Sequence, residues 1–242
     1  MKRTNGTPAC RQAGTDKRTT KLIVALDVDS SRRVKELVNL FYPKVKFFKV
    51  GSQLFTACGP KIIDWIHQKR AKVFLDLKFH DIPHSVAQSA KIATRMGVFM
   101  FNLHAQGGRE MMQQAKEAAE RESRCLKIKR PLIVAVTVLT SQQDKETTIR
   151  VLELARDVKE AGLDGVVASV NEVGLIRQAM GEKFIIVTPG IRLSTISLDD
   201  QRRVATPAEA KAKGVDFIVA GRPLLETKEP LSVLKDILRQ LR

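Results

Sequence analysis

The feature that most constrains the fold is an alternation of short apolar runs and amphipathic segments that begins at Lys21 and continues to the end of the chain. The apolar runs are hydrophobic on both faces, which is typical of strands in a parallel sheet covered by helices. We expect eight strands, at residues 22–26, 45–50, 73–78, 98–103, 132–138, 165–169, 184–187 and 215–220.

The segments between the strands have a helical period. Ser30 or Ser31 is suited to cap the first helix, Pro83 to stand in the first turn of another, and Thr206 to cap a short one. One continuous helix is predicted from Leu54 to Gln68. The other helices are predicted to begin near residues 31, 83, 109, 146, 172, 206 and 230.

Eight strand–helix units favour an α/β fold closed into a (β/α)₈ TIM barrel rather than an open doubly wound sheet. A chain of 242 residues with 43% hydrophobic residues suits one such domain, which we assign to residues 21–242. Residues 1–20 are rich in Thr, Gly, Lys and Arg without an apolar period, so we expect a disordered basic tail.

The charge is strongly positive: 42 Lys and Arg against 26 Asp and Glu give +16. A barrel that binds nucleic acid without catalysis is therefore one alternative. The basic residues are spread over helix faces, however, and only one Trp and one Tyr could stack on bases. We therefore favour a solvated basic surface that also attracts an anionic substrate.

Cys10, Cys58 and Cys125 are far apart and have no metal-ligand spacing. Together with the lack of a secretory signal pattern, they predict a cytoplasmic protein with free thiols and no metal site. The sequence has no run of about 18 apolar residues, so we expect no transmembrane helix.

Charged residues gather where the third strand ends. Asp76 and Lys78 are two residues apart and should point to the same side of the strand, with Asp81 in the following loop. Burying such charges is costly unless they pair or take part in chemistry. Because Asp27 and Lys49 end the neighbouring strands, the four residues could form an alternating acid–base chain at the barrel mouth, where such folds place their sites.

The loops after the last two strands carry a second set of polar residues. Loops at this position of a barrel commonly bind phosphate through backbone N–H groups and the start of an extra helix. Gly221 would let the backbone approach a phosphate, and Arg222 could bind its oxygens. The long segment 190–203, with Arg192 and Gln201, could close over a bound anion.

The segment Asp76-Leu77-Lys78-Phe79-His80-Asp81-Ile82-Pro83 closely resembles the signature of the orotidine 5′-phosphate decarboxylase family, in its bacterial, monofunctional form. The resemblance covers about residues 21–240. Shorter motifs of the family follow in the family's order: Ala25-Leu26-Asp27, Lys49-Val50-Gly51, Val136 to Ser141, Thr188 to Arg192, Asp200 to Arg203 and Gly221-Arg222-Pro223.

The resemblance implies decarboxylation of orotidine 5′-monophosphate to UMP without a cofactor, by a homodimer with shared active sites. Lys78 would donate a proton to C6, Asp76 would face the substrate carboxylate, and Asp81 would reach the partner's site. The remaining implied substrate contacts are Asp27 and Lys49 at the ribose, Thr140 at the pyrimidine, Ser85 at a helix start, and Arg192, Gln201, Gly221 and Arg222 at the phosphate and lid.

This sequence departs from the family pattern at His84-Ser85, where Asn-Thr is common, and in a short segment 141–161. The closest rival is a sugar-phosphate decarboxylase or aldolase of the same barrel superfamily. A resemblance to those enzymes would imply Mg²⁺ and an acidic pair in place of the second lysine. Lys78 stands where that acidic pair would need a carboxylate.

Overall fold

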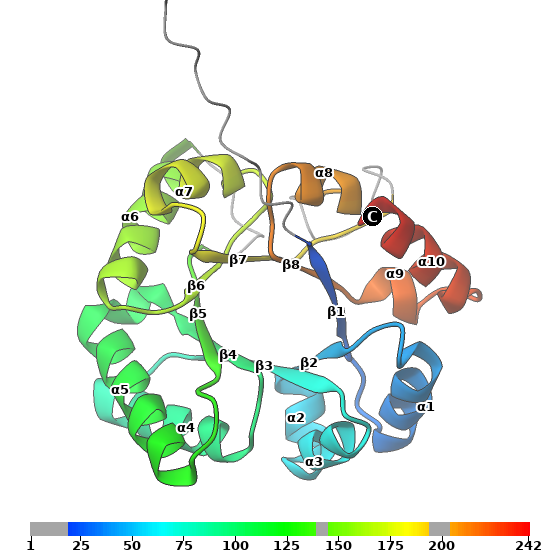
Figure 1. The fold of residues 1–242 in the computed structure, drawn as a ribbon, viewed down its shortest axis with the longest axis horizontal. Coiled ribbons are helices and arrows are strands. Elements are labelled where there is room, and N and C mark those ends of the chain that lie inside the picture. Colours follow the sequence, from blue (N-terminus) through cyan, green and yellow to red (C-terminus); the bar gives the residue numbers. More distant parts are fainter. Residues whose placement is uncertain (1–18, 139–144, 194–203) are drawn as a thin grey trace, which may run out of the picture.

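The computed structural model describes residues 19–138, 145–193 and 204–242. Its parallel strands close into a barrel in the order β1 to β8, and β1 pairs with β8. Helices surround this ring on the outside (Figure 1). The strands are β1 Lys21–Ala25, β2 Phe47–Gly51, β3 Lys72–Phe79, β4 Met100–His104, β5 Leu132–Val136, β6 Gly165–Val167, β7 Ile185–Thr188 and β8 Phe217–Ala220. The predicted (β/α)₈ barrel is confirmed.

The helices follow the predicted order along the chain. They are α1 Ser31–Phe41, α2 Ser52–Cys58, α3 Lys61–Gln68, α4 Pro83–Arg95, α5 Gly108–Leu126, α6 Lys145–Glu160, α7 Val173–Met180, α8 Pro207–Ala212, α9 Arg222–Leu225 and α10 Pro230–Gln240, with a 3₁₀ turn at Ala105–Gly107. Ser30 caps α1, and Thr206 caps α8 through a reciprocal capping box with Glu209.

The single helix predicted from Leu54 to Gln68 is wrong. The structure has α2 and α3 there, separated by Gly59 and Pro60. Gly59 has a φ of 64°, which ends α2 in a conformation that a helix cannot continue. Pro60 lacks the N–H that an uninterrupted helix would need. The helix predicted to begin near residue 109 is α5, which begins at Gly108 and ends at Leu126.

The core has two layers. A large outer cluster lies between the strands and the helices, and includes Val34, Leu37 and Phe41 of α1. A smaller cluster fills the inside of the barrel, with Ile23, Met100 and Val134 among its members. Alternation along each strand supplies both layers, because successive side chains point to opposite faces. The site lies above the inner cluster.

Three aromatic rings close the amino-terminal end of the barrel. The rings of Phe47, Phe99 and Phe217 have centroids 5.0 to 5.9 Å apart. The ammonium of Lys72 lies over two of these rings, and that of Lys21 over the third. The barrel is therefore packed with aromatic rings at its amino-terminal end. The polar side chains of its interior lie at the carboxyl ends of the strands.

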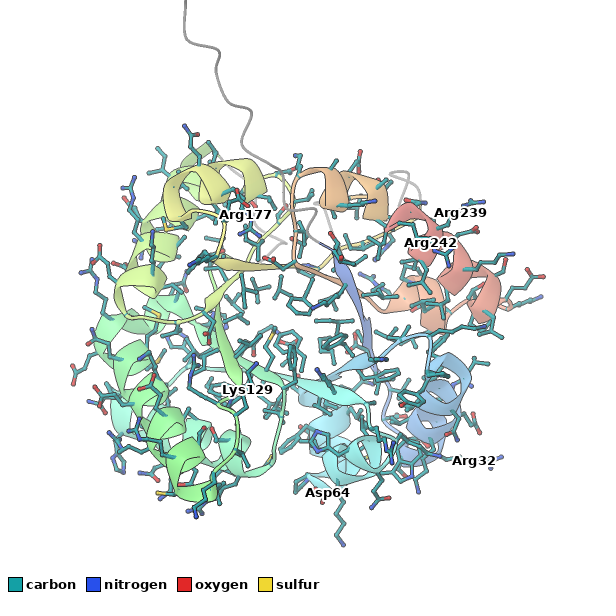
Figure 2. The ribbon with its side chains drawn as sticks, viewed as in Figure 1. Arg32, Asp64, Lys129, Arg177, Arg239 and Arg242 are labelled. Carbon is teal, nitrogen blue, oxygen red and sulfur yellow. The ribbon has the colours of Figure 1, made fainter. Side chains whose placement is uncertain are left out.

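Buried ion pairs join the outer elements. Arg177 of α7 donates hydrogen bonds to the carbonyls of Gly214 and Phe184 and pairs with Asp216, so it connects α7 with the segments before β7 and β8. In Figure 2 the exposed Arg32 points away from the molecule, whereas Arg177 lies within it. A buried pair such as Arg177–Asp216 matters more for stability than an exposed pair such as Arg32–Glu36, because surface pairs are screened by water.

Thr20 was predicted to belong to the disordered tail, but its side chain is buried and its hydroxyl donates to the carbonyl of Val215 at 2.8 Å. Thr20 is thus attached to the barrel just before β1. Residues 1–18 of the predicted tail lie outside the described residues. Among the residues that are described, no helix is long and apolar enough to cross a bilayer.

Candidate active site

A cavity of about 250 Å³ opens at the carboxyl ends of the strands. Apolar side chains of the barrel interior form its floor, among them Phe74, Val187 and Val219. The rest of its lining comes from two groups of neighbouring strands: Asp27 after β1 with Lys49, Asp76, Lys78 and Asn102 of β2 to β4, and Gly190, Arg192, Gly221 and Arg222 after β7 and β8. This is the face at which the sequence predicts a site.

The structure joins four of the predicted site residues into an alternating chain of charges. Lys49 Nζ lies 2.8 Å from Asp27 Oδ1 and 3.2 Å from Asp76 Oδ2. The other oxygen of Asp76, Oδ1, lies 2.7 Å from Lys78 Nζ. Each acid therefore contacts at least one ammonium group, and Asp76 contacts two. At such distances, opposite charges attract by roughly 5–6 kcal/mol at an effective dielectric of about 20, before desolvation.

Burial and pairing act in opposite directions on the two central residues. Burial alone would lower the pKa of Lys49, but the carboxylates of Asp76 and Asp27 outweigh it and hold that pKa above its ordinary value. Burial would likewise raise the pKa of Asp76, but Lys49, Lys78 and Asn102 hold it below its ordinary value. Both residues are thus charged at neutral pH.

Lys78 differs from Lys49 in its access to the cavity. The side chain of Lys49 is 12% exposed, whereas that of Lys78 is 39% exposed. Lys49 is enclosed between carboxylates, and Lys78 keeps one side of its ammonium open to a ligand. A charged donor held on one side and open on the other is suited to give a proton to a bound molecule.

Two glycines allow the close approach of backbone to these charges. A Cβ at Gly51 would stand 2.9 Å from Lys49 Nζ, and one at Gly221 would stand 3.3 Å from Asp27 Oδ2. Gly221 precedes α9, the extra short helix expected after the last strand, and its carbonyl accepts the N–H groups of Leu224 and Leu225. Arg222, the first residue of α9, lines the cavity beside it.

The segment that contains Arg192 is closed at its base by backbone contacts. Ile191 forms an isolated parallel bridge with Ala205, and the N–H of Arg192 donates to the carbonyl of Ala205 at 2.9 Å. The two ends of the predicted lid therefore meet beside the part of the cavity that Gly190 and Arg192 line. Gln201 within that lid, and Thr140 in the loop after β5, lie outside the described residues.

Asp81 and Ser85 do not line the cavity of their own chain. Asp81 is exposed, and its Oδ1 accepts the N–H of Ile82 at 2.6 Å. Ile82 itself is 65% exposed, which is high for a large apolar side chain. Ser85 is partly buried in the first turn of α4. These residues form a rim beside the mouth.

Two features of the site were not predicted from the sequence. Asn102 of β4 is buried and hydrogen-bonds both Asp76 and the backbone of Lys78. Lys78 also has a left-handed backbone, with a φ of 51°. The strand period predicts which face a side chain occupies, but it does not predict a local distortion of the backbone. A polar residue in the apolar strand 98–103 was the one available sign of the first feature.

His80 and His104 stack beside the site with ring centroids 5.2 Å apart. Burial, with smaller effects from His80 and Lys78, lowers the pKa of His104 below its ordinary value. Neither ring lines the cavity. In the part of the chain that the structure describes, no three His, Cys, Asp or Glu side chains gather in a way that could hold a metal ion.

Comparison with known proteins identifies the family. The model of the orotidine 5′-phosphate decarboxylase / HUMPS family matches residues 20–237. The chain belongs to this family. It is 47% identical over 232 residues to orotidine 5′-phosphate decarboxylase of Syntrophotalea carbinolica, covering 91% of this chain and 94% of the relative, and 44% identical to that of Syntrophomonas wolfei, covering 91% and 97%.

A solved structure of the family agrees. The crystal structure of orotidine 5′-phosphate decarboxylase from Lactobacillus acidophilus superposes with a TM-score of 0.81 at 34% identity, covering 92% of this chain and 99% of that chain. The family resemblance carried by the segment Asp76 to Pro83 is therefore confirmed over nearly the whole chain.

Proposed function

We propose that this protein is an orotidine 5′-phosphate decarboxylase, which converts orotidine 5′-monophosphate to UMP and CO₂ in pyrimidine biosynthesis. The observation that carries the proposal is the alternating chain Asp27–Lys49–Asp76–Lys78, which ends in an ammonium open to the cavity. The relatives that match this chain over most of its length carry the same enzyme name.

The reaction needs a positively charged group beside the carbon that loses CO₂. When the bond between C6 and the carboxyl group breaks, CO₂ leaves and the electron pair stays on C6. The ammonium of Lys78 stabilises this negative charge and then transfers a proton from Nζ to C6, which gives UMP and a neutral lysine. A further proton from water restores the ammonium. Because Asp76 fixes the ammonium at 2.7 Å, little reorganisation is needed during the reaction.

Asp76 has a second role in this proposal. It lines the cavity next to Lys78, so the substrate carboxylate would lie near a carboxylate that its neighbours keep ionised. The repulsion between the two groups is relieved as CO₂ departs. Lys49 keeps Asp76 charged and in place, since it contacts both Asp76 and Asp27. Asp27, at the edge of the cavity, is placed to contact ribose hydroxyls.

The opposite side of the cavity is suited to the phosphate. Arg192 and Arg222 supply positive charge there, and Gly190 and Gly221 line the cavity without side chains. Binding a phosphate far from C6 helps catalysis when it closes the segment 190–203 over the substrate. The contributions of Gln201 to this closure and of Thr140 to the pyrimidine remain predictions, as does a location in the cytoplasm.

We further propose that the enzyme is a homodimer in which Asp81 completes the site of the partner subunit, with Ser85 contacting the same region. Asp81 and the 65% exposed Ile82 stand on the rim beside the mouth, and Asp81 does not line its own cavity. If sites are shared, mixing the inactive variants Lys78→Ala and Asp81→Ala restores part of the activity. No recovery after subunit exchange would contradict sharing.

The decisive assay follows the loss of orotidine 5′-monophosphate absorbance with EDTA present. Turnover under these conditions is expected here, whereas a Mg²⁺-dependent sugar-phosphate enzyme of the same barrel superfamily would leave the nucleotide unchanged and lose its own activity. Lys78→Ala should abolish turnover with the fold intact. Lys72→Ala is the matched control, because Lys72 begins the same strand at the opposite end of the barrel. Near-normal turnover in Lys78→Ala would refute the proposed mechanism.

A further inference from the structure

The backbone of Lys78 is held in an unusual conformation. Its φ of 51° lies in the left-handed region, which costs an L-residue about 1–2 kcal/mol. A residue stays there when its surroundings hold it in place. The pairing of β3 with β4 is interrupted at the same place: Leu75 pairs with Phe101 and Phe79 with Leu103, so β3 advances four residues while β4 advances two.

The side chain of Asn102 fills this interruption. Its Oδ1 accepts the backbone N–H of Lys78 at 2.8 Å, and its Nδ2 donates to Asp76 Oδ1 at 2.7 Å. The orientation of the amide is fixed by its partners, since one is a donor and the other a carboxylate. Asn102 is 1% exposed, so neither partner could readily exchange it for water.

Both contacts of Asn102 act on the same lysine, one directly and one through Asp76. Asp76 Oδ1, which Asn102 holds, is also the oxygen that accepts from Lys78 Nζ at 2.7 Å. The amide therefore fixes Lys78 at its backbone and, through Asp76, at the tip of its side chain. A regular strand pairing could fix the backbone alone.

We propose that Asn102 is a positioning residue, which keeps Lys78 in its left-handed conformation and Asp76 in register with it so that the ammonium faces the reacting carbon. This inference rests on the proposed function. A residue that merely satisfies a buried N–H would affect stability and leave turnover alone. A positioning residue affects kcat, because a misplacement of about 1 Å can cost about 10²-fold in rate.

The test compares Asn102→Leu, which keeps the shape of the side chain and removes both hydrogen bonds, with Thr94→Val. Thr94 is also fully buried and its hydroxyl donates to the carbonyl of Ala90 in α4, away from the cavity. We expect kcat for orotidine 5′-monophosphate to fall about 10²-fold in Asn102→Leu while KM changes by less than about threefold. Thr94→Val should lose stability and keep its kcat.

An unchanged kcat in a folded Asn102→Leu protein would overturn the proposal. If that variant does not fold, Asn102→Asp serves in its place, since it keeps an acceptor for Lys78 and sets a carboxylate in place of the donor against Asp76. We expect its kcat to fall as well, and a wild-type kcat would again overturn the proposal.

Failure of the proposed function gives a different result. In that case the wild-type protein does not turn over the nucleotide, and the role of Asn102 is judged from crystal structures of the wild type and Asn102→Leu. Lys78 leaving the left-handed region, or its Nζ moving by about 1 Å or more from Asp76, would support the positioning role. An unchanged Lys78 would overturn it.

Discussion

Replacing Gly51 with Ala should impair the site without unfolding the protein. The φ of Gly51 is −91°, which alanine adopts freely. The added Cβ would stand 2.9 Å from Lys49 Nζ, whereas ordinary contacts begin at 3.4 Å, so the ammonium must move by about 0.5 Å. Lys49 has little room for this movement, because it contacts Asp27 at 2.8 Å and Asp76 at 3.2 Å.

The magnitude follows from these distances. Lengthening a contact of 2.8 Å by 0.5 Å weakens the attraction by about 1 kcal/mol at an effective dielectric near 20, which corresponds to about fivefold in rate. The displacement of Asp76 that follows adds to this, so we expect kcat/KM to fall by roughly tenfold to a hundredfold. The free energy of unfolding should change by less than about 1 kcal/mol.

The assay is steady-state decarboxylation, with urea unfolding of the same samples. Gly174→Ala is the matched control, since a Cβ at Gly174 meets no atom within 4 Å and Gly174 lies in α7. That variant should keep its activity. If Gly51→Ala has a kcat/KM within about twofold of the wild type, the lysine is not held as tightly as these contacts indicate.

Three further predictions concern the phosphate side, a buried arginine and pH. Arg222→Ala should raise KM more than it lowers kcat, because it removes a phosphate contact, and an unchanged kcat/KM would place the phosphate elsewhere. Arg177→Met should lower the free energy of unfolding in urea by about 3 kcal/mol or more, since it removes buried bonds to Gly214 and Asp216, while Arg32→Met at the surface should have little effect. Asp76 has a lowered pKa in the folded protein, so the stability it contributes is present above the unfolded pKa of about 3.9 and is lost as pH falls through the folded value. The wild type should therefore lose stability between neutral pH and acid more steeply than Asp76→Asn, and parallel curves would contradict this.

Much of the fold could be predicted because it depends on patterns that repeat. Runs such as Leu22 to Leu26 are apolar on both faces, and only a covered parallel sheet buries both. The facing of Asp76 and Lys78 followed from the strand period, and their contacts with Lys49 and Asp27 from the order of strands in a barrel. The family motifs then suggested which of these residues act on a substrate.

What could not be predicted depends on single local conformations. Gly59-Pro60 divides a segment whose apolar period continues across it, so the period alone gave one helix. The left-handed turn at Lys78 and the shifted pairing with β4 arise from tertiary contacts with Asn102. Lysine has no intrinsic preference for such a conformation, and no short-range pattern marks it.

The aromatic closure formed by Phe47, Phe99 and Phe217 has a consequence for traffic through the enzyme. In the described part of the chain the barrel is closed at its amino-terminal end and open at the carboxyl ends of its strands. A ligand must therefore enter and leave the cavity through the same opening. The incoming nucleotide and the departing one thus need the same passage, and they cannot occupy it together. Accumulated UMP would then slow the enzyme by competing directly with its substrate.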